Sequence, residues 1–119
     1  MRKTTREDVF RLHAQFCKAL GDANRLLIIV ELRDRARTVG EIADAIGAGQ
    51  SLTSRHLAVL REKGLVRAER DGNFVRYSLA DRRIVSAIEL LLDVLAAQLA
   101  RQGTHSTVAR RLRSVARAS

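Results

Sequence analysis

The sequence predicts a mainly α-helical protein with a small β-hairpin, arranged as a winged helix-turn-helix with extra helices at both ends. Two segments with helical apolar spacing, joined by Gly47-Ala48-Gly49, form the expected helix-turn-helix. After Gly64 the apolar period changes from helical to alternating, and Asp71-Gly72 marks the turn of a hairpin. Residues 81–100 then return to helical spacing, which indicates a long closing helix.

Two helices are predicted ahead of the helix-turn-helix. Residues 6–20 place their apolar side chains at helical spacing, and Gly21 is a suitable end for that helix. Asp22 is a good N-cap for a second helix over residues 24–35. We therefore expect the N-terminal part of the chain to be helical.

The helix-turn-helix itself occupies residues 38–63. Thr38 and Glu41 have the spacing of a capping box, in which each side chain bonds the backbone of the other residue, so a helix begins there. The next helix runs from Gln50 to Lys63 and is stopped by Gly64. In such a motif the second helix enters the major groove of DNA, with its N-terminal residues at the base edges.

The helix after the hairpin has one broad apolar stripe. Full burial of each large aliphatic side chain stabilises by about 1.5–3 kcal/mol, whereas an exposed stripe would form an adhesive patch. The stripe has six such residues, Ile84, Ile88, Leu91, Leu92, Leu95 and Leu99, which is more than a small winged domain needs on one side. We therefore expect the first and last helices to be dimerisation helices. The predicted homodimer interface consists of Val9, Phe16, Ile88, Leu91, Leu92 and Leu95.

Length and composition limit the possible partners and compartments. The 119 residues suffice for one domain, and we assign residues 1–102 to DNA binding and dimerisation and residues 103–119 to a basic tail that could be disordered. The net charge of +9 favours a polyanionic partner, nucleic acid before a membrane surface. A single cysteine, Cys17, excludes an intrachain disulfide and favours a reducing compartment. With no secretion signal or membrane span in the sequence, we expect a cytoplasmic protein.

The second helix of the helix-turn-helix has a polar outward side. With Leu57 and Leu60 as buried anchors, Thr53 falls on the same inward side, and Ser51, Arg55 and Glu62 point outward, so that the first two turns carry no outward carboxylate. Amide, hydroxyl and guanidinium groups suit base edges and phosphates, although an ordinary solvated helix would also carry them. Basic residues around the hairpin turn would lie beside the same groove. The candidate DNA-binding residues are Thr38, Gln50, Ser51, Leu52, Ser54, Arg55, His56, Arg70, Asn73 and Arg76.

Three segments resemble the ArsR/SmtB family of bacterial winged-helix regulators. They are KALGDANRLLII, VGEIADAIGAGQSLTSRHLAVLREKGLV and RAERDGNFVRYSLA, and the likeness covers about residues 9–100. The resemblance implies a homodimer joined through its first and last helices and bound to an inverted repeat in promoter DNA. It also implies repression that is relieved by a metal ion or another small signal.

The sequence departs from that family in two places. Members often have a small residue, Thr and Val where this chain has Ser51-Leu52-Thr53; Leu52 then either meets a thymine methyl group or tucks against the neighbouring helix. The cysteines of the family's arsenic-type site are absent from residues 38–41. Of the positions that match its zinc-type site, only Asp81 keeps a metal-binding side chain. Redox-sensing relatives use two cysteines, and this chain has one.

His13 and Cys17 are the remaining candidates for a signal site. They lie four residues apart on the first predicted helix, so their side chains can meet and provide half of a site for a divalent metal effector such as Zn, Ni or Cu. The alternative is that Cys17 is a small buried apolar residue beside Phe16.

Three functions compete for this sequence. The first is a dimeric, sequence-specific DNA-binding transcriptional regulator, expected to be a repressor, and the second is a non-specific nucleoid or architectural protein driven by the arginine-rich tail. Both would lose affinity with salt, but only the regulator would keep a specificity ratio of roughly a thousand or more. The third is a protein-interaction adaptor with a vestigial wing. An enzyme is not expected, because no nucleophile–base arrangement, glycine-rich phosphate loop or carboxylate cluster occurs.

Overall fold

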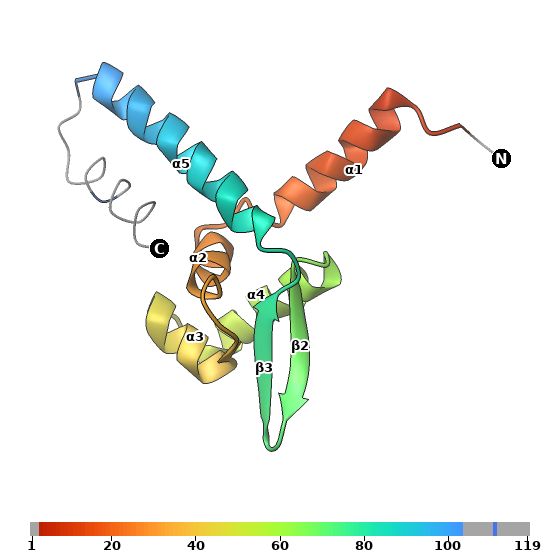
Figure 1. The fold of residues 1–119 in the computed structure, drawn as a ribbon, viewed down its shortest axis with the longest axis vertical. Coiled ribbons are helices and arrows are strands. Elements are labelled where there is room, and N and C mark those ends of the chain that lie inside the picture. The colour runs from red at the N-terminus through yellow and green to blue at the C-terminus, as the bar shows by residue number, and fades with distance from the viewer. Residues whose placement is uncertain (1–2, 104–110, 112–119) are drawn as a thin grey trace. The chain divides into compact units, whose positions relative to one another are not determined.

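The computed structural model describes residues 3–103 and residue 111, and these form five helices and three strands (Figure 1). The predicted basic tail, apart from Gly103 and Arg111, lies outside the described residues. In chain order the elements are α1 (Arg6–Lys18), α2 (Ala23–Glu31), β1 (Arg37–Thr38), α3 (Val39–Ile46), α4 (Gln50–Glu62), β2 (Val66–Asp71), β3 (Phe74–Leu79) and α5 (Arg83–Arg101). The predicted mainly α-helical fold with a hairpin is confirmed.

The chain divides into two compact units, Met1–Arg82 and Arg83–Ser119. In the first unit α2, α3 and α4 pack on one another, and α4 also packs on β2. The core of this unit consists of side chains with no exposed surface: Ile28, Ile29, Ile42, Leu57 and Leu60. α4 is therefore anchored by its own chain along one side, as the positions of the apolar residues in the sequence predict.

Side chains cap the first three helices. Thr5 and Asp8 form a capping box on α1, and Asp22 accepts a hydrogen bond from the backbone N–H of Arg25 at the start of α2. The predicted capping box of Thr38 and Glu41 is present on α3. Such caps satisfy backbone donors that the first helical turn leaves free. They explain why these helices begin where they do, although α2 ends at Glu31, earlier than predicted.

The sheet has three antiparallel strands in the order β1-β3-β2. β2 and β3 pair from Val66 opposite Leu79 to Asp71 opposite Phe74, so a two-residue turn joins them. Gly72 begins that turn with φ of 63°, a conformation that favours glycine. The sequence indicated only the hairpin; the third strand, β1, pairs Arg37 with Tyr77 and Thr38 with Arg76.

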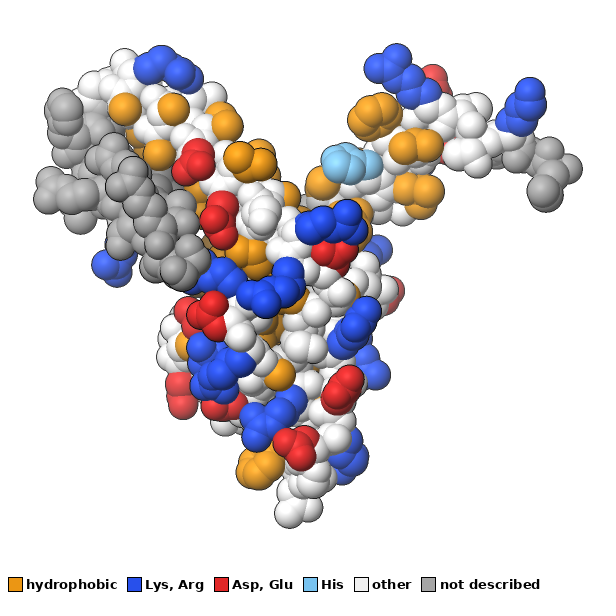
Figure 2. Space-filling model, viewed as in Figure 1, with side chains coloured by type: hydrophobic (Ala, Val, Ile, Leu, Met, Phe, Trp, Pro, Cys, Tyr) orange, Lys and Arg blue, Asp and Glu red, His pale blue; other side chains and the backbone are white. Residues whose placement is uncertain are grey.

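α1 and α5 each carry apolar side chains at the surface (Figure 2). No residue of α1, which is described in full, is buried. α5 buries Val85, Ile88 and Ala96 but exposes four large apolar side chains, Leu90, Leu91, Val94 and Leu95. Ile88, predicted for the dimer interface, is 5% exposed in the single chain, and its place in that interface stays a prediction. No helix in the described part of the chain is long and apolar enough to cross a membrane.

Candidate nucleic-acid interface

α4 presents a polar side to the solvent, as predicted. Thr53, Leu57 and Leu60 have no exposed surface, and the Thr53 hydroxyl donates a hydrogen bond to the Gly49 carbonyl at 2.8 Å. The opposite side, here named the outward face of α4, comprises the exposed residues Gln50, Ser51, Ser54 and Arg55. Leu52 is half-buried at the edge of this face, so both alternatives for it stay open. The outward face offers donors and acceptors without a carboxylate, which suits the edges of bases.

The N-terminus of α4 differs from those of α1, α2 and α3. Its N-cap is Gly49, which has no side chain to bond the free backbone N–H groups, and neither the N-cap nor the first turn of α4 carries an acidic residue. Free N–H groups and the positive end of the helix dipole together favour an anion. This terminus is therefore suited to a phosphate of the DNA backbone.

His56 does not lie on the outward face, and its prediction as a phosphate contact is corrected. It is 9% exposed, and Arg25 on α2 approaches its Nδ1 with Nη1 at 3.3 Å. Because a guanidinium only donates, Nδ1 accepts this hydrogen bond, and the hydrogen of the neutral ring belongs on Nε2. Nε2 in turn lies 3.7 Å from the Asp22 carboxylate. A helical position beside Leu57 explains the burial of the ring.

Asp22 combines its capping role with this polar group. The backbone N–H of Arg25, which bonds Oδ1 at 3.2 Å, lowers the pKa of the Asp22 carboxyl below its ordinary value of 3.8, and the charge of the Arg25 guanidinium adds to the effect. The lowered pKa keeps the carboxylate ionised opposite Arg25 and His56. The first turn of α2 is therefore linked to α4 by polar contacts as well as by apolar packing.

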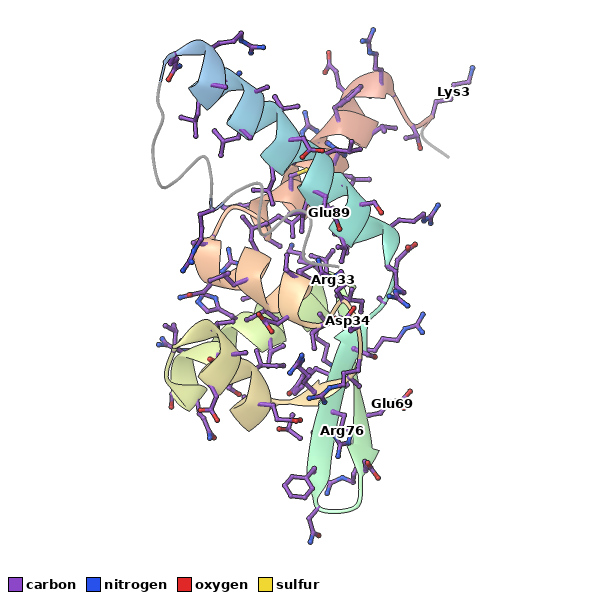
Figure 3. The ribbon with its side chains drawn as sticks, turned by 60° about the vertical axis from the view of Figure 1, so that its left-hand side comes forward. Lys3, Arg33, Asp34, Glu69, Arg76 and Glu89 are labelled. Atoms are coloured by element: carbon purple, nitrogen blue, oxygen red, sulfur yellow. The ribbon has the colours of Figure 1, made fainter. Side chains whose placement is uncertain are left out.

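The wing, defined here as β2, β3 and their turn, places its predicted DNA contacts unequally. Arg70 and Asn73 are exposed near the turn, where a phosphate or the minor groove can reach them. Arg76 is instead engaged: its Nε bonds Asp71 at 2.9 Å, and its Nη1 lies 3.7 Å from Glu41. Figure 3 shows Arg76 on the hairpin with Glu69, its partner residue across the strands. Arg76 therefore ties the wing to the start of α3.

Thr38 is likewise engaged in hydrogen bonds within the protein. Its hydroxyl accepts the backbone N–H of Glu41 at 3.2 Å, and the Glu41 carboxylate accepts the backbone N–H of Thr38 at 2.9 Å. That second hydrogen bond lowers the pKa of the Glu41 carboxyl below its ordinary value of 4.5, with Arg35 adding to the effect. The contribution of Thr38 is the capping of α3, and a DNA contact there stays a prediction.

Two features of the interface were not predicted from the sequence. Phe74 is 60% exposed beside the hairpin turn, next to Val75, which is 37% exposed. An aromatic residue directly after a turn signal could have indicated this position, because a hairpin tip has little to pack against. The other feature is the contact between Arg25 and His56, whose sequence separation of 31 residues leaves no local signal.

The predicted His13–Cys17 pair is present on α1. Cys17 Sγ lies 3.5 Å from His13 Nε2, and both residues are exposed, so the alternative of a buried cysteine is wrong for the single chain. Two donors are fewer than a metal site needs. Among the described residues no group of three or more His, Cys, Asp or Glu side chains could hold a metal ion.

Comparisons with known proteins converge on one family. A sequence profile described as "Bacterial regulatory protein, arsR family" matches residues 22–68, from the cap of α2 into β2. The HTH-type transcriptional regulator Rv0081 of Mycobacterium tuberculosis is 38% identical over 91 residues, which cover 76% of this chain and 80% of that protein. The HTH-type transcriptional regulator CmtR of Mycobacterium bovis is 39% identical over 84 residues, 71% of each chain.

Solved structures agree with the sequence relatives. The crystal structure of Rv0081 matches with a TM-score of 0.71 and 37% identity, over 79% of this chain and 95% of that one. The winged helix-turn-helix DNA-binding domain of Mb0332 from Mycobacterium bovis, solved as a homodimer, matches with a TM-score of 0.70 and 28% identity. That match covers 88% of this chain and 95% of the domain. The helix-turn-helix and the wing are thus placed as in proteins of this kind.

Proposed function

Since the chain belongs to the ArsR family of bacterial regulatory proteins, we propose that it binds an inverted repeat in promoter DNA as a homodimer and represses transcription. One observation carries the proposal most directly. The outward face of α4 is polar and free of carboxylates, and the helix is held from behind by side chains with no exposed surface. A helix fixed in this way presents its side chains to DNA at little cost in conformational entropy.

The contacts divide into two kinds. Gln50, Ser51, Ser54 and Arg55 read base edges in the major groove, with Arg55 suited to guanine and Gln50 to adenine. The uncapped N-terminus of α4 and the exposed Arg70 bind phosphates, which supply affinity and fix the register. In a homodimer the two copies of α4 would be about 34 Å apart, the spacing of successive major grooves.

Dimerisation covers apolar surface that one chain leaves exposed. Val9 and Phe16 on α1 are 52% and 38% exposed, and Leu91 and Leu95 on α5 are 69% and 41% exposed. The relative Mb0332 is described as homodimeric. A second copy of this chain is thus the occupant we propose for these faces. A regulator that binds promoter DNA would act in the cytoplasm, which is the compartment we propose. It acts by binding rather than by catalysis.

Selection of bound duplexes from a random pool tests this function. We expect the wild-type dimer to enrich an inverted repeat and to prefer it roughly a thousandfold over scrambled duplex at moderate salt. Arg55→Ala would weaken binding to the repeat roughly tenfold or more and relax the choice of one base pair per half-site. Equal competition by scrambled duplexes would instead support a non-specific nucleoid protein, and unchanged binding by Arg55→Ala would support the adaptor function.

We further propose a divalent metal as the effector, with His13 and Cys17 as two of its ligands. The observation that favours it is the 3.5 Å approach of Cys17 Sγ to His13 Nε2 at the surface of α1. A thiolate and an imidazole suit Zn, Ni or Cu, and the other ligands must come from outside the pair. Calorimetry with each metal should detect binding to the wild type that is lost in both His13→Ala and Cys17→Ser. Equal affinity of the variants and the wild type for every metal would reject this pair as the site.

A further inference from the structure

Arg25 contacts two helices other than its own, and its contacts suggest a role beyond stability. We propose that Arg25 is a positioning residue that ties α4 to the C-terminal end of α1 through His56, so that the position of α1 sets how well α4 binds DNA. This inference rests on the proposed reading of DNA by α4. Neither Arg25 nor the link to α1 was among the residues that the sequence indicated.

On the α1 side, Arg25 binds the backbone where the helix ends. Its Nε donates to the Ala19 carbonyl at 2.5 Å, and its Nη2 donates to the Lys18 carbonyl at 3.4 Å. The last carbonyls of a helix have no partner within the helix and carry partial negative charge, so a guanidinium is well suited to them. Ala19 is 3% exposed, which makes this end of α1 the part held by the protein interior.

On the α4 side, the third nitrogen of the same guanidinium bonds the ring of His56. Arg25 Nη1 donates to His56 Nδ1 at 3.3 Å, and His56 follows directly after Arg55 of the outward face. The planar guanidinium fixes the directions of its donors, so one side chain relates two backbone carbonyls of the α1 end to one ring of α4. Asp22 holds the far side of the ring, with its Oδ1 at 3.7 Å from Nε2.

This contact differs in kind from the apolar packing of α4. Leu57 and Leu60 are fully buried and stabilise α4 against its neighbours, but apolar packing is largely non-directional. A charged hydrogen bond has a preferred length and angle and resists a rotation or slide of the helix. Because no residue of α1 is buried, the protein itself leaves that helix free to follow whatever covers its apolar side chains. Through the Arg25–His56 contact, a movement of α1 would shift α4.

The candidate effector pair lies on the same part of α1. Cys17 directly precedes Lys18 and Ala19, whose carbonyls hold Arg25. A change at Cys17 therefore reaches α4 through one side chain, without passing through the apolar core. Coupling of this kind is reciprocal, so DNA bound at α4 should also be sensed at Cys17.

Two substitutions of His56 separate the link from the stability of the fold. In His56→Leu the buried position stays filled by an apolar side chain, but the acceptor for Arg25 is lost. His56→Gln keeps an acceptor, since its amide oxygen can take the hydrogen bond from Arg25. Loss of one charged hydrogen bond predicts roughly tenfold weaker binding of the pool-selected duplex by His56→Leu, and binding close to wild type by His56→Gln.

Arg25→Lys tests the other end of the contact. Lysine keeps the charge but cannot bind two carbonyls and the ring together, so it should weaken duplex binding to a similar extent. The double variant Arg25→Lys with His56→Leu should bind no more weakly than either single variant, because both remove the same link. Sedimentation should show all variants as dimers, which separates the link from dimerisation.

A fluorine label on Cys17, the one cysteine of the chain, gives the spectroscopic readout. A trifluoroethyl group attached there reports on the end of α1. Addition of the selected duplex should shift its ¹⁹F resonance in the wild type and in His56→Gln, and leave it in place in His56→Leu at saturating DNA. A role of His56 in stability alone would not remove the shift.

The possible failures can be told apart. If the wild type does not prefer the selected duplex, the proposed function fails and not only the link. If Arg55→Ala weakens binding while Arg25→Lys and His56→Leu bind as the wild type with the same ¹⁹F response, the function stands and the link is rejected. If His56→Leu does not fold, Arg25→Lys and the Gln variant decide, because Arg25 is only partly buried.

Discussion

α1 and α4 have the same length, 13 residues each, yet a single chain buries the inward side of α4 only. α4 buries Thr53, His56, Leu57 and Leu60 and keeps a polar outward face. α1 buries none of its residues and exposes four large apolar ones, Val9, Phe10, Leu12 and Phe16. A helix whose apolar side is buried within its own chain has its polar side available for DNA. A helix whose apolar side stays exposed needs a second copy of the chain to cover it.

The largest effect is expected from truncation of the buried side of α4. Leu57→Ala removes a side chain with no exposed surface and should destabilise the fold by about 2–5 kcal/mol. The matched control is Leu12→Ala on α1, which is 65% exposed and should change stability by about 0.5 kcal/mol or less when dimerisation is held constant. Urea unfolding at one fixed protein concentration measures both. Similar losses in the two variants would show that α1 is also part of the core of the single chain.

The next effect concerns the apolar side of α1. Phe16→Glu puts a charge where a second copy is proposed to pack, and loss of that burial should weaken the dimer roughly tenfold or more. Gln15→Glu adds the same charge at a neighbouring exposed position and should leave the dimer intact. Analytical ultracentrifugation over a dilution series distinguishes the two. A dimer that tolerates Phe16→Glu as well as Gln15→Glu would remove α1 from the interface.

Local chemistry explains which parts of this comparison could be read from the sequence. Asp22, Thr38 with Glu41, and Gly64 end or begin helices through contacts within a few residues, and all three positions are confirmed. The inward side of α4 followed from the spacing of Thr53, Leu57 and Leu60, and their complete burial confirms it. The helix ends depend on hydrogen bonds between nearby residues, and the inward side of α4 depends on the helical period. Both kinds of information are present in the sequence.

The errors come from contacts between distant residues. His56 is predicted as a DNA contact from its position on the second helix of the motif, but its ring is buried and bonds Arg25, which lies 31 residues earlier. β1 was missed because its two residues carry no strand period and gain their pairing only from β3. Helical spacing also gives α1 and α5 apolar stripes, but it does not show which of these residues a single chain covers.

A smaller effect is expected at the uncapped start of α4. Gly49 has φ of −69°, and a Cβ there would meet nothing within 4 Å, so other residues fit. Gly49→Ser should add a few tenths of a kcal/mol of stability as a cap. Gly49→Asp would cap the helix equally but place a negative charge where a phosphate is proposed. It should weaken duplex binding several-fold at low salt, an estimate from the strength of exposed charge interactions.

Binding titrations of both variants with the selected duplex and with scrambled duplex check the effect. The loss in Gly49→Asp should be uniform over sequences, since a phosphate contact carries no base information. Gly49→Ser separates the charge from the added side chain. Undiminished binding by Gly49→Asp at low salt would place the phosphates elsewhere.

The smallest effect is the loss of stability at low pH, which should differ between α4 and the helices that have carboxylate caps. The pKa of Asp22 is lowered by the backbone N–H of Arg25, and that of Glu41 by the backbone N–H of Thr38. Each folded-state pKa lies below the unfolded value, so the stability from these caps is present above the ordinary values of 3.8 and 4.5. It is lost as the pH falls through the lowered folded-state values. The starts of α2 and α3 should thus loosen in acid before the start of α4, which has no ionisable cap.

Thermal unfolding from about pH 6 to about pH 3 should show this loss, and the double variant Asp22→Asn with Glu41→Gln should show less of it. Both amides retain an oxygen that can accept the capping hydrogen bond but have no proton to gain, so the caps persist while their titration disappears. The same acid dependence in the variant and the wild type would assign the loss to other carboxylates. Hydrogen exchange resolved by residue adds the local test. The amides of Arg25 and Glu41 bond the side-chain caps, and that of Thr53 makes the first backbone bond of α4. Loosening at Thr53 together with Arg25 and Glu41 would show that α4 depends on the capped helices for its own start.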